Sequence, residues 1–289
     1  MAGLMAEEVA AFRRDGYLTV PDAVTSDELA ALNRQVAGWV QESRRHQAAW
    51  GEQVDGRPRF DLASGHDADN PQLRRVNNPS EVSDAFRAVM SNSRMTDMVA
   101  DLIGPDVAFH HCKINLKLPG ADTEVGWHQD FAYTPHSNDD LVTALLFLDE
   151  VTEENGALAV VPGSHREGLK SLWADGKFTG AVAEPVAAEA RRRAALSTGP
   201  AGSVCLMHTM LLHGSRANAS ARSRNLYIAV YAAADAVPLA PSPVPSSLQG
   251  TIVRGVRPRC ARLTGGMIEL PPHYGASSFF EIQRAARGG

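Results

Sequence analysis

Trp127-His128-Gln129-Asp130 is the stretch around which the chain is organised. His128 and Asp130 are two residues apart, and side chains at this spacing on an extended strand point to the same side. Two such ligands leave a metal ion in need of a further ligand from elsewhere in the chain. The best candidate is His213, in the segment Leu211-Leu212-His213-Gly214-Ser215.

Two histidines and one carboxylate on one face of a metal, with the opposite face open, are the ligand set of non-haem Fe(II) oxygenases. Arg224 stands eleven residues after His213, at the head of a strand-like run. A planar guanidinium there can hold a carboxylate through two hydrogen bonds. The pair His128 and Asp130 alone would also fit a surface strand beside a turn. The ordered set of His128, Asp130, His213 and Arg224 indicates a metal site.

These residues belong to a longer pattern that resembles the phytanoyl-CoA dioxygenase family of Fe(II)/2-oxoglutarate oxygenases. The resemblance covers most of the chain, in residues 12–17 (FRRDGY), 127–130 (WHQD), 154–158 (ENGAL), 161–165 (VPGSH), 208–215 (HTMLLHGS) and 218–224 (NASARSR). It implies a jelly-roll (double-stranded β-helix) core with added helices. It also implies an enzyme that uses Fe(II), 2-oxoglutarate as cosubstrate and O2.

The resemblance assigns roles to particular residues of this chain. His128, Asp130 and His213 would be the iron ligands, and Arg224 would pair with the distal carboxylate of 2-oxoglutarate. A carboxylate at position 130, where related halogenases carry a small residue, favours oxygenation over halogenation. Ser215 and Asn115 are expected to add contacts to 2-oxoglutarate. Contacts to the substrate, or positions beside the ligands, are expected for Lys113, Gln129, Phe131, His165 and His208.

Several of these residues leave an alternative open. Lys113 shares a predicted strand face with Asn115. It would either contact an anionic group of the substrate or be an ordinary solvated lysine. His208 is interpreted as a core histidine or as a neighbour of the ligands. His165, after the turn Pro162-Gly163-Ser164, is expected near the cosubstrate. Arg222 is expected to be exposed and not to bind the cosubstrate.

Composition excludes several classes of protein. The chain has 289 residues, of which 44% are hydrophobic, enough for one large domain with a full core. The formal net charge of -5 gives no sign of a nucleic-acid partner. We expect no membrane span and no signal peptide, because there is no long apolar run and the N-terminus lacks a basic start. Three widely spaced cysteines, Cys112, Cys205 and Cys260, favour a reducing cytoplasm.

Local patterns predict mainly helices and loops in the first hundred residues. Residues 7–14 and the segment after Thr25-Ser26-Asp27-Glu28, a capping box, predict helices. Residues 83–103 predict another, broken near residues 91–93, while residues 17–20 predict a strand. The polar residues 42–78 predict a long loop that closes over the site, and residues 172–178 are a second lid candidate. Residues 181–196 fit either a helix or a connection into a strand.

From residue 107 the pattern changes to strands, at residues 107–118, 141–148, 157–161, 203–206 and 225–232. Strict alternation in the first strand would place Phe109, His111, Lys113, Asn115 and Lys117 on one face. A zinc site at His110-His111-Cys112 is rejected, because neighbours on a strand face opposite ways and a four-ligand set is missing. The tail, with Tyr274, Phe279 and Phe280, is expected to pack on the domain.

These expectations describe one domain. Residues 1–106 would be mostly helical, residues 107–235 would form the jelly-roll core with the metal site, and residues 236–289 would be loops packed on it. The expected reaction is hydroxylation of an unactivated C–H bond of a small molecule, an amino-acid derivative or an intermediate of secondary metabolism. Alternatives are a cupin-like protein that binds a metal or ligand without turnover, an oxygenase of an acyl-CoA, and a hydrolase or isomerase with another metal. The sequence does not indicate the oligomeric state.

Overall fold

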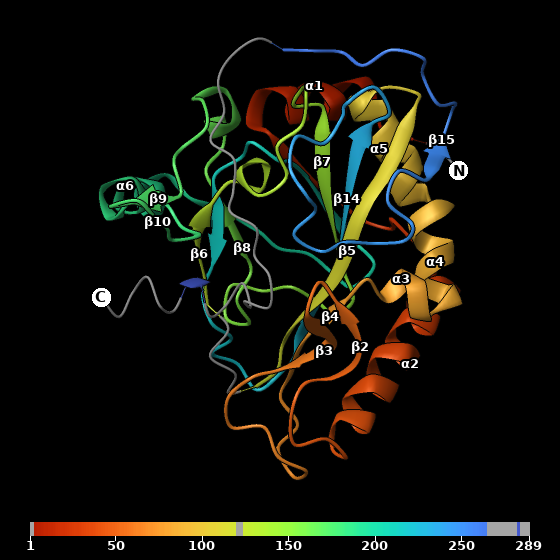
Figure 1. Ribbon diagram of the computed structural model, residues 1–289, viewed down its shortest axis with the longest axis vertical. Helices are drawn as coiled ribbons and strands as arrows, with labels where there is room; N and C mark the ends of the chain where they lie inside the picture. The colour runs from red at the N-terminus through yellow and green to blue at the C-terminus, as the bar shows by residue number, and fades with distance from the viewer. Residues whose placement is uncertain (1–2, 120–123, 265–281, 284–289) are drawn as a thin grey trace.

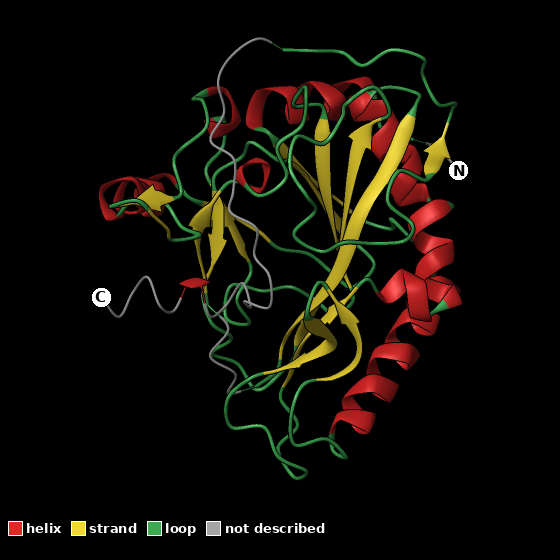
Figure 2. Ribbon diagram, viewed as in Figure 1, coloured by secondary structure: helices red, strands yellow, loops and turns green. Residues whose placement is uncertain are grey.

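The computed structural model describes residues 3–119, 124–264 and 282–283. Two antiparallel sheets, of nine and four strands, build most of this part of the molecule, and helices cover the outer side of the larger one (Figures 1 and 2). This arrangement confirms the predicted jelly-roll core. None of the described helices is long and apolar enough to cross a membrane.

The larger sheet has nine strands in the described part of the chain and the order β1-β12-β7-β14-β5-β4-β3-β2, with β15 also paired to β5. Its strands are β1 (Tyr17–Val20), β2 (Trp50–Val54), β3 (Arg57–Leu62), β4 (Leu73–Asn77), β5 (Val107–Lys117), β7 (Leu141–Phe147), β12 (Val204–His208), β14 (Arg224–Ala233) and β15 (Ile252–Arg254). The central strands β7 and β14 are buried along their whole length. They therefore form the buried centre of the larger sheet, beside which a site can be built.

The smaller sheet carries two of the predicted metal ligands. Its order is β11-β8-β13-β6, with β6 (Val125–His128), β8 (Leu158–Val160), β11 (Ala195–Ser197) and β13 (His213–Ser215). The turn at residues 153–156 thus joins β7 of one sheet to β8 of the other. A buried cluster that includes Leu145, Ile228, Val160 and Met207 packs between the sheets.

The helices are α1 (Ala6–Asp15), α2 (Ser26–Ser43), α3 (Pro79–Val82), α4 (Asp84–Ser91), α5 (Arg94–Ile103) and α6 (Glu184–Arg193). Thr25 caps α2 as predicted: its hydroxyl accepts the backbone N–H of Glu28, whose carboxylate accepts the N–H of Thr25. The predicted break between α4 and α5 is confirmed. The ambiguous residues 181–196 hold both α6 and β11. A second apolar cluster, with Phe86, Met98 and Tyr227, packs between the helices and the larger sheet.

The prediction of a long loop at residues 42–78 is wrong. This segment contains β2, β3 and β4, which extend the larger sheet beyond β5. Residues 1–106 therefore contribute four strands besides their helices, and residues 236–264 contribute β15. The division into three parts stays a prediction, and Tyr274, Phe279 and Phe280 lie outside the described residues.

The alternation predicted for β5 fails at one point. His111 pairs with Val230 of β14 and Phe109 pairs with Tyr231, so His110 is an extra residue in the strand. This β-bulge puts Phe109 in the apolar core instead of on the face of His111. It also brings the rings of His110 and His111 together, with 2.6 Å between their Nδ1 atoms, although alternation would have separated them.

Candidate metal centre and cosubstrate pocket

The three predicted metal ligands converge in the described structure. His128 ends β6 and His213 begins β13, and the two are cross-strand partners. Asp130 opens a short 3-10 helix, η1 (Asp130–Ala132), directly after β6. Its Oδ1 lies 3.5 Å from Nε2 of His128 and 3.7 Å from Nε2 of His213. One potential ligand atom from each residue lies within 4.8 Å of the others, so this group can hold a metal ion.

Neighbouring hydrogen bonds fix which atoms face the metal position. Nδ1 of His128 donates to the carbonyl of Gly126 at 2.8 Å, and Nδ1 of His213 donates to that of Leu211 at 2.9 Å. Both Nε2 atoms are then the unprotonated nitrogens, as metal binding requires. Thr143 donates to Oδ2 of Asp130 at 2.6 Å and leaves Oδ1 for the metal. The donor set therefore fits Fe(II).

The protonation states also suit a metal. Burial alone would raise the pKa of Asp130, but His213, His128 and Lys113 together lower it below its usual range. Burial, with the charge of His128, lowers the pKa of His213 to about 4. At neutral pH the carboxylate is ionised and the His213 imidazole is neutral, so little proton release opposes metal binding.

Arg224 lies at one end of the cavity that contains the triad. It is buried, and its Nε and Nη2 donate to the carbonyl of Gly156 at 3.1 and 2.5 Å. Gly156 adopts a positive φ of 85°, and a side chain there would meet the Arg216 carbonyl at 2.7 Å. The turn that resembles the family pattern thus fixes the guanidinium in place. Burial lowers the pKa of Arg224 to about 9, which keeps it cationic at neutral pH.

Lys117 is a buried basic residue of the cavity that the sequence did not single out as a site residue. It is the cross-strand partner of Arg224, and its Nζ donates to the hydroxyl of Ser215 at 2.9 Å and to the Arg216 carbonyl. Burial and the charge of Arg224 lower its pKa to about 6. The alternation of β5 had placed Lys117 on the face of Lys113 and Asn115, and that pattern was the available signal. Arg224, Lys117 and Ser215 thus lie together at this end of the cavity.

The wall of the cavity beyond the triad holds Asn115, Lys113, Arg75 and Arg57. Asn115 accepts a hydrogen bond of 3.0 Å from Nε of Arg75, its partner across β4 and β5. The structure thus places the predicted Asn115 and Lys113 in the cavity. Of the neighbours Arg74 and Arg75, only Arg75 lines the cavity, because Arg74 pairs with Asp61.

Four predicted residues lie away from the cavity. The side-chain amide of Gln129 bridges two loops: it donates to the carbonyls of Gly168 and Met210 and accepts from the N–H of Lys170. Phe131 packs in an apolar cluster. The rings of His165 and His208 lie 5.3 Å apart beside α1, and His165 contacts the carbonyl of Arg13. The expectation that His165 lies near the cosubstrate is therefore wrong.

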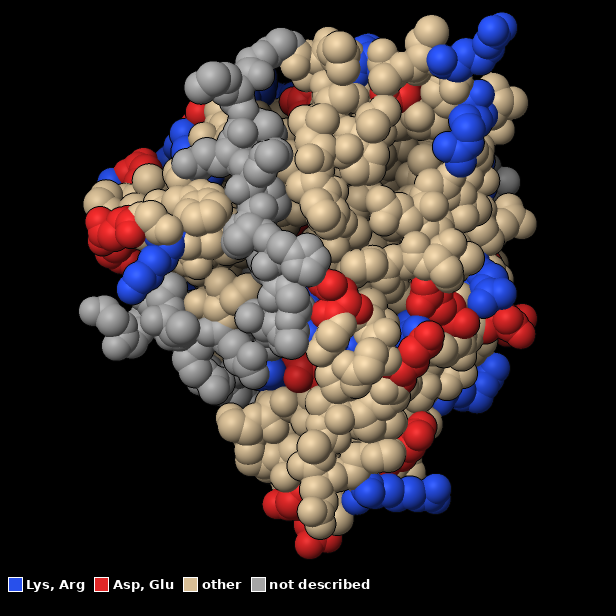
Figure 3. All heavy atoms as spheres, in the orientation of Figure 1, with Lys and Arg blue, Asp and Glu red and all other residues tan. Residues whose placement is uncertain are grey.

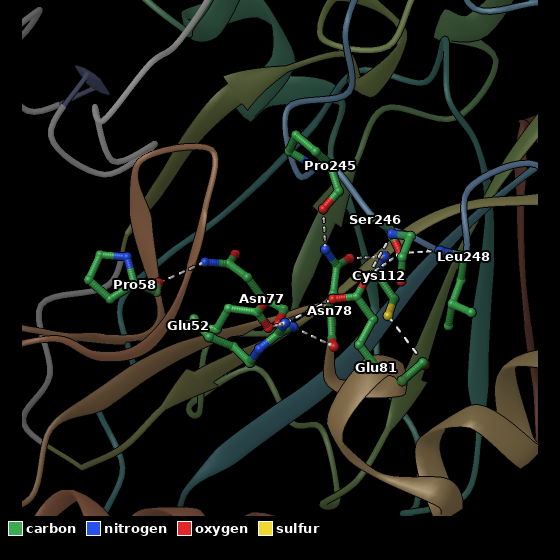
Figure 4. A network of polar contacts seen from close by, with 12 residues as sticks. Glu52, Pro58, Asn77, Asn78, Glu81, Cys112, Pro245, Ser246 and Leu248 are labelled. Atoms are coloured by element: carbon green, nitrogen blue, oxygen red, sulfur yellow. Dashed lines mark hydrogen bonds and ion pairs between the residues drawn. The ribbon is translucent and has the colours of Figure 1, made fainter.

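A loop of the C-terminal part covers the cavity, and we call residues 242–248 the roof loop. Its Pro243 and Val244 line the cavity. Figure 4 shows how the roof loop is held: Asn78 donates to the Pro245 carbonyl at 2.5 Å, and Glu81 accepts from the hydroxyl of Ser246 at 3.0 Å. The lid candidate at residues 172–178 instead contains a hairpin of β9 (Trp173–Ala174) and β10 (Lys177–Phe178), which borders a second hollow. Its closure over the metal stays a prediction.

Comparison with known proteins agrees with this geometry. The model of the phytanoyl-CoA dioxygenase family matches residues 12–226. The chain is 38% identical over 227 residues to a probable alpha-ketoglutarate-dependent hypophosphite dioxygenase of Stutzerimonas stutzeri, which covers 74% of this chain and 76% of that protein. It is 25% identical to the L-proline trans-4-hydroxylase of Streptomyces griseoviridis, over 76% of this chain and 83% of that protein.

Solved structures show the same fold. The crystal structure of EctD from S. alaskensis with bound Fe superposes with a TM-score of 0.67 and 24% identity, over 93% of this chain and 89% of that chain. The carbocyclase SnoK from nogalamycin biosynthesis superposes with a TM-score of 0.62 and 22% identity, over 81% of this chain and 86% of that chain.

Proposed function

Since the chain belongs to the phytanoyl-CoA dioxygenase family and is an Fe(II)- and 2-oxoglutarate-dependent dioxygenase, we propose that it hydroxylates a small molecule at the site of His128, Asp130 and His213. The observation that carries this assignment is that Nε2 of His128, Nε2 of His213 and Oδ1 of Asp130 lie close together. The other polar atom of each side chain makes a hydrogen bond that fixes its orientation. Bound iron would supply the activation of O2. One oxygen atom enters the product, and the other enters succinate as 2-oxoglutarate loses CO2.

The protein residues prepare this reaction in three ways. His128, Asp130 and His213 occupy one face of the metal and leave the other for cosubstrate and O2. Arg224, with Lys117 and Ser215, would hold the distal carboxylate of 2-oxoglutarate and so orient its oxo-acid end toward the metal. Apolar side chains between the sheets, including Leu145 and Ile228, line the cavity and limit the access of water.

The relatives act on different small molecules, and their names include hypophosphite, L-proline and ectoine. We propose a small-molecule substrate for this chain and an intracellular, reducing environment, with which the three free thiols of Cys112, Cys205 and Cys260 are consistent. An amino-acid derivative or an intermediate of secondary metabolism fits the expected C–H hydroxylation.

Succinate formation tests the proposal. Purified protein with Fe(II), 2-oxoglutarate and O2 should release succinate, slowly alone and faster with a true substrate from a panel of small molecules and acyl-CoA thioesters. His128→Ala and Asp130→Ala should lose metal binding and succinate release while the fold survives, because the sheets have their own apolar core. Full succinate release in either variant would refute the ligand assignment. Absence of succinate with intact metal binding would favour the non-catalytic alternative.

A further inference from the structure

The cavity around the triad is strongly cationic. Among the described residues that line it, five are basic, namely Arg57, Arg75, Lys113, Lys117 and Arg224, and Asp130 is the one carboxylate. This excess does not reflect the whole chain, which carries a formal net charge of -5. Figure 3 shows both basic and acidic side chains across the described part of one outer face. The positive charge is thus concentrated at the site.

The basic residues form two groups at different places in the cavity. Lys117 and Arg224 form the cosubstrate pocket at the end of β5. Lys113 lies four residues earlier on the same strand face, about 13 Å away along an extended strand, and pairs in register with Asn77 of β4. Arg75, also on β4, pairs with Asn115, between the two lysines. A carboxylate bound at Arg224 would therefore not reach Arg75 and Lys113, and a different ligand can bind there.

The charge balance of the site also favours a second anion. Fe(II) and the dianion of 2-oxoglutarate would neutralise each other, and Asp55 pairs with Arg57. Among the described lining residues, Asp130 is then the one carboxylate that faces the other basic side chains. Asp61, which accepts hydrogen bonds of 2.7 and 3.2 Å from Arg74, also acts on Arg75 and lessens the positive charge of this wall. Cations gathered in a buried wall are costly unless anions accompany them.

The two basic residues of the wall, Arg75 and Lys113, line the same cavity as the triad, and Lys113 acts on the triad electrostatically. Burial and the neighbouring charge of Arg75 lower the pKa of Lys113 to about 8, and Lys113 in turn acts on Asp130 and His213. A negative group between Arg75 and Lys113 would relieve this repulsion. A substrate held there would place its remaining atoms beside the metal position.

We propose that Arg75 and Lys113 form an anion subsite, which holds an oxyanionic group of the substrate while 2-oxoglutarate occupies the pocket of Arg224 and Lys117. The inference rests on the proposed function and names its substrate class: a compact molecule with a carboxylate, phosphinate or phosphonate group. The bond that is oxidised lies a few bonds from that group. Arg57 stands beside the subsite, where it also pairs with Asp55 at 3.8 Å and donates to the Pro243 carbonyl.

Equilibrium binding without turnover tests the anion subsite. The protein is loaded with Mn(II) and saturating 2-oxoglutarate, so that the metal and the Arg224 pocket are filled. Its thermal unfolding is then followed with acetate or hypophosphite, and with acetamide as a neutral counterpart of acetate. Both anions should raise the melting temperature and acetamide should not, because binding to the folded state alone stabilises it.

Variants of Arg75 and Lys113 test whether these two residues bind the anion. Lys113→Met and Arg75→Gln should weaken anion binding on the order of 30-fold or more, while Arg222→Gln, at an exposed ion pair with Glu150, should leave it unchanged. Lys113→Met should also raise the melting temperature of the unliganded protein, because it removes a buried cation. Arg75→Lys keeps the charge and should retain most of the affinity. It serves as the second variant if Arg75→Gln does not fold.

Three results would overturn the anion subsite: stabilisation by acetamide equal to that by acetate, unchanged anion affinity in Lys113→Met, or a loss in that variant of 2-oxoglutarate affinity alone. The last result would assign the wall to the cosubstrate. Failure of 2-oxoglutarate to stabilise the wild-type protein would count against the proposed function instead. Anion titration of the metal-free protein and of Lys113→Met would then still decide the subsite.

Discussion

Lys117 on β5 and Arg224 on β14 are direct cross-strand partners, so two buried basic side chains lie side by side at one end of the cavity. Such a pair is unfavourable by itself, because burial and mutual repulsion both oppose the charged forms. A carboxylate bound between them, as we propose for 2-oxoglutarate, would offset this cost. On this proposal, occupation by an anion would stabilise this end of the cavity.

The first prediction concerns Arg224. Arg224→Gln should raise the KM for 2-oxoglutarate about 100-fold, because loss of a buried partner of a carboxylate costs several kcal/mol, on the order of 2–5. Arg222→Gln is the matched control, since Arg222 is exposed and pairs with Glu150 at 3.0 Å. Steady-state succinate formation measures both variants. If Arg222→Gln had the larger effect, the assignment of the cosubstrate pocket would be wrong.

The second prediction concerns the proton on Lys117. Because its pKa is lowered to about 6, Lys117 is mostly neutral near pH 7.5 in the free protein, and a bound carboxylate favours its charged form. Binding of 2-oxoglutarate should therefore take up close to one proton at that pH. Calorimetry in two buffers of different ionisation enthalpy measures this uptake. It should vanish in Lys117→Met and persist in Lys177→Met, a substitution at an exposed lysine of β10.

The same shift makes stability depend on pH. The unfolded chain holds the Lys117 proton up to the ordinary value of 10.5, whereas the unliganded folded chain releases it at about 6. The contribution of Lys117 to the free energy of unfolding therefore rises with pH between these two values. Lys117→Met should remove that slope from a series of denaturant titrations. An unchanged slope would contradict the burial of the Lys117 amine beside Arg224.

A third prediction tests the hydrogen bond between Thr143 and Asp130. Thr143→Val keeps the shape of the side chain but removes the donor to Oδ2, and loss of such an outer partner typically weakens metal affinity about 10- to 100-fold. Thr209→Val is the control, because the buried Thr209 hydroxyl has no hydrogen-bond partner among the described residues. Competition with a chromophoric chelator for Mn(II) measures both. Equal affinities in the two variants would show that Thr143 does not orient the ligand.

The parts of the site that the sequence predicts are those with a local signal. His128 and Asp130 lie two residues apart, and the capping box at Thr25 spans four residues, so chain geometry alone places them. His213 and Arg224 required the longer family pattern, because pairing of β13 with β6, and of β14 with β5, brings together residues that are distant in sequence.

The errors have physical causes as well. The strands in residues 42–78 carry buried arginines such as Arg59 and Arg75, whose charges are met by internal partners or face the cavity, so their sequence resembles a polar loop. The bulge at His110 adds one residue to β5, and nothing in the local sequence marks it. Gln129 lies between two ligands, yet its place after the end of β6 turns it toward neighbouring loops.

The last prediction concerns the roof loop and Glu81 of α3. Oε1 of Glu81 accepts hydrogen bonds from the Ser246 hydroxyl, the Ser247 N–H and the Ser247 hydroxyl at 3.0, 2.7 and 2.9 Å. Its Oε2 accepts from Arg59 at 2.9 Å. One carboxylate thus joins the roof loop to the extension formed by β3 and β4. Glu81→Gln removes the charge and offers one acceptor oxygen where the native side chain offers two.

Glu81→Gln should therefore loosen the roof loop without disturbing the triad. Hydrogen exchange of residues 246–248 should accelerate. The KM for the substrate should rise severalfold while the KM for 2-oxoglutarate stays the same, because Pro243 and Val244 line the cavity whereas Arg224 is held by the Gly156 carbonyl. Glu150→Gln, at an exposed ion pair, is the control. Burial alone would raise the pKa of Glu81, but its hydrogen bonds lower it. Acidification of the wild-type protein through that lowered pKa protonates Glu81 and should therefore accelerate the same hydrogen exchange as the variant does. Unchanged exchange in both experiments would show that the other contacts of the roof loop, from Asn78 and Arg57, suffice to hold it.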